Sequence, residues 1–213
     1  MDLAASLVSI GEELRAVLEA KNAAREKGLA LSRKLVRTSA NAIRAIHRGD
    51  REPADALLDE AQRCLEEAQA AMAEHPDIRY AGFLHDAAKE YAEARITYAL
   101  VFGLPLPEPG FLGVEAAAYL NGMGEAVGEM RRHLLDLMRR GELEQSEQLL
   151  GAMDEIYALL ISMDYPDAMT GGLRRTTDVT RSIVERTRGD LSTTLIQHEL
   201  KQALDDARRR LEV

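Results

Sequence analysis

Tryptophan is absent from the sequence, cysteine occurs once, and aromatic residues make up only 4% of the chain. A single cysteine, Cys64, excludes an internal disulfide and fits a reducing compartment, so we expect a cytoplasmic protein in which this thiol has a packing role. The chain also has no phosphate-loop glycine motif, zinc-ligand spacing, nucleophile elbow or CxxC pair. Their absence disfavours the enzyme classes that depend on those motifs.

Long apolar runs are also missing, because charged residues or glycine interrupt every apolar stretch within a few positions. No segment has the length needed to span a bilayer, so we expect no membrane partner. Residues 1–21 carry Asp2, Glu12 and Glu13 and no leading positive cluster. They predict an amphipathic helix and no signal or transit peptide.

The 213 residues carry a net charge of −9, which by itself argues against a general nucleic-acid binder. The charge is unevenly distributed, however. Residues 21–51 contain only Glu26 and Asp50 as acids, against nine cations: Lys21, Arg25, Lys27, Arg33, Lys34, Arg37, Arg44, Arg48 and Arg51. The chain therefore has a basic helix within an acidic protein.

Apolar residues recur every three or four positions, beginning with Leu3, Leu7, Ile10, Leu14 and Leu18, and no strand pattern is present. We expect an all-α protein, a seven-helix bundle forming one domain over residues 1–213. The first expected helix runs from the N-terminal residues to about residue 47. The other six cover residues 53–74, 76–102, 112–140, 142–163, 173–189 and about 190–213. The breaks are the proline-rich loop 103–110, the turn 169–173 and a cap at Asp190 or Ser192.

Four glutamates form two pairs at helical spacing. Glu90 and Glu93 are three residues apart, Glu125 and Glu129 are four apart, and each pair shares one helix face. Gly122, Gly124 and Gly128 accompany the second pair. Each glycine costs about 0.5–1 kcal/mol in a helix interior, so three together indicate close approach of another helix or of a ligand.

Two such pairs on neighbouring helices can bring four carboxylates together, and their mutual repulsion then requires a cation or raised pKa values. Oxygen ligands favour Mg²⁺ or Mn²⁺, and a carboxylate-held Mg²⁺ can support phosphodiester hydrolysis. The alternative is an ordinary solvated surface. The chain has other acidic pairs, Glu66/Glu67 and Glu144/Glu147, that we expect to be solvated, so spacing alone leaves both interpretations open.

Three segments resemble the translin and translin-associated factor X family. Residues 25–37 (REKGLALSRKLVR) with 43–48 (IRAIHR) resemble its basic N-terminal helix, which ends in a His-Arg pair. Residues 89–94 (KEYAEA) resemble its Gln-Glu-Tyr-x-Glu-Ala segment, and residues 119–132 (YLNGMGEAVGEMRR) resemble its Tyr-Leu-x-Gly-x-x-Asp-x-x-Gly-Glu-x-x-Arg segment. The segments occur in the family's order, and the resemblance covers essentially the whole chain.

The resemblance implies a translin-like fold and the branch that carries acids, which is similar to a Mg²⁺-dependent endoribonuclease acting on single-stranded RNA. Glu90, Glu93 and Glu129 match the family's acids. Glu125 stands where the family more often has Asp, and its longer side chain can still bind a metal. These four residues are the expected catalytic and metal-binding set.

The same resemblance implies binding of single-stranded RNA, and of single-stranded DNA as a second ligand, by Arg25, Lys27, Arg33, Lys34, Arg37, Arg44, His47 and Arg48. It also implies a closed barrel of identical subunits, an octamer in preference to a hexamer. The rival hypothesis is a non-catalytic translin-like oligomer that holds single-stranded nucleic acid, in which the acids only balance charge.

Overall fold

Helices dominate the computed structural model, which describes residues 3–211; Met1, Asp2, Glu212 and Val213 of the expected domain lie outside the described residues. Within 3–211 there are nine helical segments and no strand. Six are long: α1 (Leu3–Arg48), α2 (Arg51–Ala71), α4 (Phe83–Val101), α6 (Ala116–Arg140), α7 (Leu143–Ser162) and α9 (Leu173–Leu211). Three are single turns: α3 (Pro76–Arg79), α5 (Pro109–Leu112) and α8 (Asp167–Thr170). The expected all-helical bundle is confirmed.

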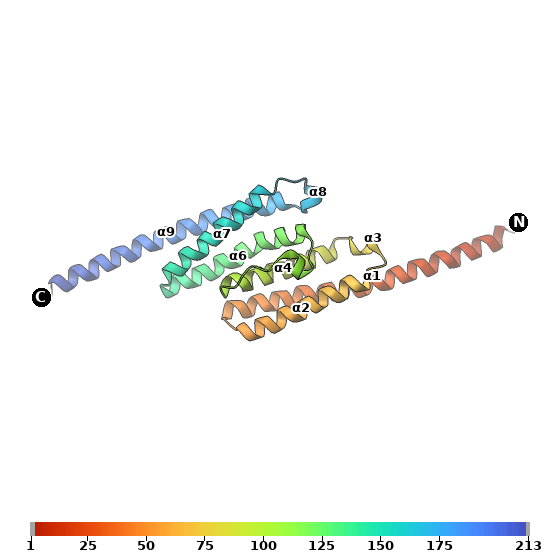
Figure 1. Ribbon diagram of the computed structural model, residues 1–213, viewed down its shortest axis with the longest axis horizontal. Coiled ribbons are helices and arrows are strands. Elements are labelled where there is room, and N and C mark those ends of the chain that lie inside the picture. The colour runs from red at the N-terminus through yellow and green to blue at the C-terminus, as the bar shows by residue number, and fades with distance from the viewer. Residues whose placement is uncertain (1–2, 212–213) are drawn as a thin grey trace.

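The long helices form two layers. In one layer α4 lies between α1 and α6, and α6 lies between α4 and α9 (Figure 1). In the other layer α2 packs on α1 and α4, while α7 packs on α6 and α9. The main core lies between the layers, and Cys64 is buried in it, as its predicted packing role requires.

Helix α1 is much longer than the bundle it packs against. Its buried residues begin at Gly28, and the preceding part projects beyond the other helices, as the C-terminal part of α9 does at the opposite end (Figure 1). In this part Lys21 pairs with Asp77 of α3, whereas apolar residues nearer the N-terminus, such as Leu7 and Leu14, are exposed. Gly49, at a φ of 78°, ends α1 where the sequence indicates.

The boundaries differ from expectation at two glycines. The helix expected over 76–102 is interrupted before Phe83, because Gly82 adopts a φ of 99° that a helix cannot continue through. The opposite error occurs at Gly189, where α9 continues without a break and no cap forms at Asp190 or Ser192. Val184, Thr187 and Leu191 keep one face of α9 buried across this point, and that packing outweighs the roughly 1 kcal/mol cost of one helical glycine.

Two other boundaries are confirmed. Helix α6 ends at Gly141, whose φ of 79° lets its amide donate back to the carbonyls of Leu137 and Met138. Gly171 and Gly172 form the expected turn before α9, both with positive φ. Over residues 3–211, no helix is both long enough and apolar enough to cross a membrane.

Candidate functional site

Helices α4 and α6 approach each other closely at Gly122. A Cβ atom at this position would lie 2.6 Å from the carbonyl oxygen of Lys89 and 3.0 Å from the Cβ of Ala92. Glycine is therefore required for the contact between the two backbones. The contact sets the segment that carries Glu90 and Glu93 against the segment that carries Glu125.

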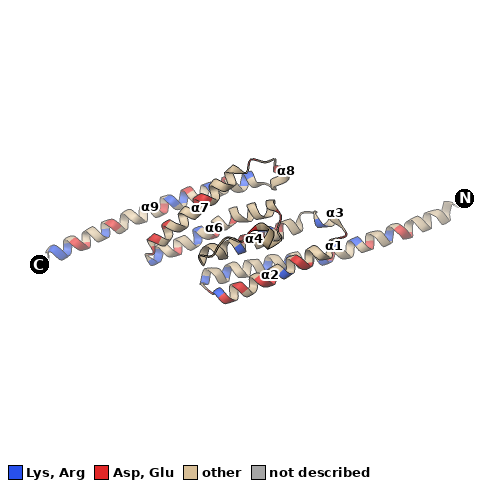
Figure 2. Cartoon of the chain, viewed as in Figure 1, with Lys and Arg blue, Asp and Glu red and all other residues tan. Residues whose placement is uncertain are grey.

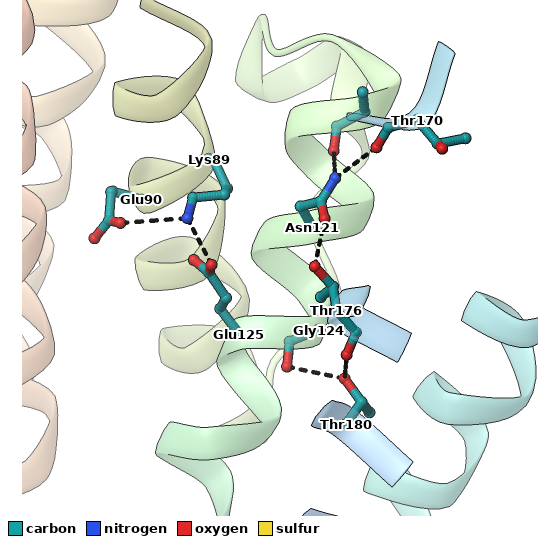
Figure 3. Close-up of polar contacts among 9 residues, drawn as sticks. Lys89, Glu90, Asn121, Gly124, Glu125, Thr170, Thr176 and Thr180 are labelled. Atoms are coloured by element: carbon teal, nitrogen blue, oxygen red, sulfur yellow. Dashed lines mark hydrogen bonds and ion pairs between the residues drawn. The ribbon is translucent and has the colours of Figure 1, made fainter. Parts of the chain in front are cut away.

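The opposite side of α6 is held against α9 by a small polar network (Figure 3). The Asn121 amide donates to the carbonyls of Ala117 (2.9 Å) and Thr170 (2.8 Å) and accepts from the Thr176 hydroxyl at 2.6 Å. A Cβ at Gly124 would collide with the Thr176 side chain. Two of the three glycines thus admit a neighbouring helix, as predicted, whereas Gly128 has only an ordinary contact nearby.

Three of the four expected carboxylates converge. One oxygen each of Glu90, Glu93 and Glu125 lies within 4.8 Å of the others. Oxygens bound to one Mg²⁺ at 2.0–2.1 Å are at most about 4.2 Å apart, so small side-chain rotations would let these three oxygens share such an ion. The residue with the atypical identity, Glu125, belongs to this acidic cluster of Glu90, Glu93 and Glu125.

Glu129 is not part of the acidic cluster. Its carboxylate instead contacts the Nε2 atom of His47 on α1. This hydrogen bond lowers the pKa of Glu129, although burial acts in the opposite direction. The two members of the second acidic pair therefore have different surroundings, despite sharing one face of α6.

Glu93 is the most enclosed member of the cluster. Its residue is 8% exposed, and among the described residues no hydrogen-bond or ion-pair partner is found for its carboxylate. Burial, followed by repulsion from Glu90 and Glu125, raises the pKa of Glu93 to about 8. Together with Glu90 and Glu125 it offers a set of carboxylate oxygens, and oxygen donors of this kind suit Mg²⁺ or Mn²⁺.

The side chain of Lys89 lies among these acids (Figure 3). Its ammonium is 2.5 Å from Oε1 of Glu125 and 3.6 Å from Oε1 of Glu90. Sequence reasoning did not identify this residue as part of the site. The sequence does show a lysine directly before Glu90. Adjacent helical residues are rotated by 100° from each other, so this lysine is not on the same face as Glu90.

The acidic cluster opens into a groove of about 870 Å³ between α4, α6 and the first turns of α9. Arg175 lines the same groove; it is exposed, and its guanidinium has no hydrogen-bond or ion-pair partner among residues 3–211. Arg131 and Arg186 line an adjoining hollow that also includes Arg175. Arg175 thus places a cation within the acidic groove.

The predicted Lys and Arg residues of the basic helix are exposed, and Figure 2 shows such cations recurring along α1. Arg33, Arg37, Arg44 and Arg48 are spaced so that they share one stripe of α1, facing away from the core. Several cations of the predicted set have local acidic or amide partners: Arg25 with Glu26, Lys34 with Glu60, Arg44 with Asn41 and Arg48 with Asp50. Lys27, Arg33 and Arg37 are exposed and have none among the described residues.

His47 lies differently from expectation. It was predicted to bind nucleic acid, but its side chain is only 4% exposed and contacts Glu129. Its Nδ1 atom is buried without a partner among the described residues. A ring enclosed in this way cannot reach a phosphate in solvent without a rearrangement.

Individual proteins and solved structures resemble this chain, although no family model matches the sequence. A curated relative, an uncharacterised protein of Methanocaldococcus jannaschii, is 30% identical over 187 residues, which are 86% of this chain and 82% of the relative. The crystal structure of AfC3PO is 35% identical with a TM-score of 0.81, over 87% of this chain and 97% of that chain. The chain belongs to the translin and translin-associated factor X family.

Two further structures support the fold of this translin-family chain. AfC3PO in complex with duplex RNA is 34% identical with a TM-score of 0.80, covering 87% of this chain and 96% of that one. Apo-NeC3PO is 21% identical with a TM-score of 0.73, covering 88% and 96%. At that lower identity the likeness shows the fold alone. The resemblance of the three sequence segments to this family is thus confirmed, and with it the translin-like fold.

Proposed function

We propose that this translin-family protein is a metal-dependent endoribonuclease that cleaves single-stranded RNA in the cytoplasm. The observation that carries the proposal is the convergence of Glu90, Glu93 and Glu125 within 4.8 Å in a groove that Arg175 also lines. Carboxylates gathered beside a free guanidinium suit a reaction that needs both a divalent cation and a bound phosphate.

The acidic cluster would hold Mg²⁺ or Mn²⁺, and Glu129 stands next to it, tied to His47. When bound, such an ion lowers the pKa of a coordinated water and offsets the negative charge that develops on the phosphate. The protein's own part is to position the phosphate. Arg175 can hold it by paired hydrogen bonds, and the contacts of Asn121 keep α9 at a fixed distance from α6.

The RNA ligand is supported by the solved complex of AfC3PO with duplex RNA and by the cations on two sides of the site. On α1 these are Arg25, Lys27, Arg33, Lys34, Arg37, Arg44 and Arg48, and on α6 and α9 they are Arg131, Arg175 and Arg186. Tyr91 and Tyr98 are buried, and the exposed rings of Tyr80, Phe111 and Tyr165 do not line the acidic groove, so the groove itself offers no ring to stack on bases. Recognition of the backbone with little base preference follows, with single-stranded DNA as a weaker ligand.

The functional form in this proposal is a closed barrel of identical subunits, an octamer in preference to a hexamer. The projecting part of α1 supports assembly, because it exposes a stripe of Leu3, Leu7, Ile10 and Leu14, each more than half accessible. The alternation of three- and four-residue steps is the pattern by which helices pack side by side. A closed assembly would also limit access to the acidic groove.

The test is a cleavage assay with end-labelled single-stranded RNA, in parallel with duplex RNA and single-stranded DNA. With Mg²⁺, the wild type is expected to cut the single strand, while Glu93→Gln and Glu125→Gln lose at least about 100-fold in rate because the cation is no longer held. RNA binding, followed by fluorescence anisotropy in EDTA, should persist in both variants. Glu144→Gln, an exposed acid on α7, is the matched control. Equal cleavage by all three variants would refute the assignment.

One observation favours the rival function, a non-catalytic oligomer that binds single-stranded RNA or DNA. The ammonium of Lys89 already contacts two of the three carboxylates, so charge is partly balanced without a metal. This alternative predicts tight oligonucleotide binding with no Mg²⁺- or Mn²⁺-dependent loss of any labelled substrate.

A further inference from the structure

Lys89 is an unusual member of a site proposed to hold a metal. It extends from α4 and bridges to Glu125 on α6, with its ammonium 2.5 Å from one carboxylate and 3.6 Å from another. Its side chain is 22% exposed, so the charge is partly withdrawn from solvent. A surface ion pair contributes little, but a partly buried and hydrogen-bonded one is stronger.

The electrostatics of the cluster favour this arrangement when no metal is present. Burial alone would lower the pKa of Lys89, but the hydrogen bond to Glu125 and the neighbouring carboxylates outweigh it, so the pKa is raised. The pKa of Glu90 is also raised, because burial outweighs the attraction of the Lys89 ammonium for the carboxylate. The cluster therefore retains one positive charge and a reduced negative charge.

The ammonium and a divalent cation cannot occupy the site together. A cation held by all three acids must approach oxygens of Glu90 and Glu125 to within about 2.0–2.6 Å, and the ammonium already lies against those two residues. Glu93, buried and without a hydrogen-bond partner, completes a donor set that one ammonium leaves unsatisfied. The lysine stem is flexible enough to withdraw while its backbone stays in α4.

We propose that Lys89 is a resident counter-ion of the acidic cluster, which a divalent cation must displace, and that the displaced ammonium then binds a phosphate in the adjoining groove. This inference rests on the proposed function of the site. Lys89 and Arg175 line the same groove, so one phosphate between α4 and α9 could contact both. Lys89 in this proposal competes with the divalent cation for the acidic cluster and, once displaced, binds the nucleic acid.

A coupling between the two ligands follows. A phosphate in the groove gives the displaced ammonium a new partner, which lowers the cost of metal entry. By thermodynamic reciprocity, bound metal must then raise the affinity for the oligonucleotide by the same factor. Without nucleic acid the site should hold divalent ions only weakly.

The experiment measures Mn²⁺ binding to the full-length protein by calorimetry and by the Mn²⁺ electron paramagnetic resonance signal. Lys89→Gln removes the competing charge and is expected to bind Mn²⁺ about tenfold more tightly than the wild type. Lys89→Arg, which keeps a cation, should remain within about twofold of the wild type, as should Lys201→Gln on the exposed end of α9. Adding oligo-deoxythymidine should strengthen Mn²⁺ binding several-fold in the wild type and less in Lys89→Gln.

The outcomes separate this inference from the proposed function. If Glu93→Gln binds Mn²⁺ as well as the wild type does, the acidic cluster is not the metal site, and both proposals fail. If Mn²⁺ binding requires Glu93 but Lys89→Gln gains no affinity, only the counter-ion role is overturned. Thermal unfolding in EDTA checks that Lys89→Gln is folded. A lowered melting temperature that Mn²⁺ restores would support the counter-ion role, and one that Mn²⁺ cannot restore would oppose it.

Discussion

The imidazole of His47 on α1 is hydrogen-bonded to the carboxylate of Glu129 on α6, although 82 positions separate the two residues in the sequence. The histidine side chain is 4% exposed and the glutamate side chain 27% exposed. The contact joins the end of the basic helix to the helix that carries Glu125. A change at either residue should therefore affect both the stability of the bundle and the acidic site.

Replacing His47 tests this connection. His47→Ala leaves the partly buried Glu129 carboxylate without its partner and is expected to lower the free energy of unfolding by about 1–3 kcal/mol in urea titrations. In a double-mutant cycle, Glu129→Gln should lose much of its own effect once His47 is absent. Additive effects of the two substitutions would show that the contact is not energetically significant.

The pH dependence of this contact has a defined sign. Because the pKa of Glu129 is lowered from its ordinary 4.5, its contribution is fully present above that value and is lost as pH falls through the depressed folded value. The stability difference between wild type and Glu129→Gln should therefore shrink on acidification below about pH 4.

The close contact at Gly122 gives a second prediction. Gly122→Ala places a methyl group 2.6 Å from the Lys89 carbonyl, which must push α4 away from α6, so a net loss of about 1–3 kcal/mol is expected. Gly151→Ala is the control, because its Cβ would meet nothing within 4 Å. That variant should gain about 0.5–1 kcal/mol from reduced backbone entropy in the unfolded chain. Urea unfolding of both variants measures the contrast, and a stabilised Gly122→Ala would contradict the packing.

Much of this site could be predicted from local spacing, for a physical reason. Helical periodicity specifies which residues share a face, so the pairing of Glu90 with Glu93 was accessible, and the glycines indicated a close neighbour. Periodicity does not specify what lies opposite that face. Glu125 and Glu129 look equivalent in the sequence, but one meets Lys89 and the other meets His47.

The same limitation explains the errors in the fold. Whether a glycine breaks a helix depends on tertiary packing: Gly82 takes a positive φ, whereas Gly189 is carried through by the buried face of α9. Arg175 could not be placed beside the acids from the sequence, because its groove exists only once α9 packs on α6. Such contacts between segments distant in the sequence have no local signature.

Glu93 predicts an unusual dependence of stability on pH. With a pKa raised from 4.5 to about 8, the folded protein retains a proton that the unfolded chain has lost across this range. In EDTA, the contribution of Glu93 to the free energy of unfolding should therefore fall as pH rises from 4.5 to about 8. Glu93→Gln stays neutral, so it should match the wild type near pH 4 and exceed it by about 4 kcal/mol at pH 8. Parallel curves for the two proteins would rule out the raised pKa.

The projecting part of α1 is predicted to hold subunits together. Leu14→Glu places a charge in the exposed apolar stripe and should reduce the mass measured by light scattering to that of a smaller species. Ala16→Glu adds the same charge on the opposite face of this helix and should leave the mass unchanged. If both variants retain the wild-type mass, the stripe is not an interface; if the wild type is itself monomeric at micromolar concentration, the proposed barrel is wrong.

Arg175 is predicted to be the phosphate contact nearest the acidic cluster. Arg175→Ala should weaken binding of single-stranded RNA about tenfold and reduce the slope of log affinity against log salt by about 0.7, the share of one phosphate on a single strand. Arg63→Ala, an exposed arginine on α2 in the other helical layer, removes the same charge away from the groove and should change neither quantity. Because the lost contact is to the backbone, the weakening should be similar for RNAs of different sequence. An unchanged slope in Arg175→Ala would show that the RNA takes another path across the protein, with the cations of α1 as the next residues to substitute.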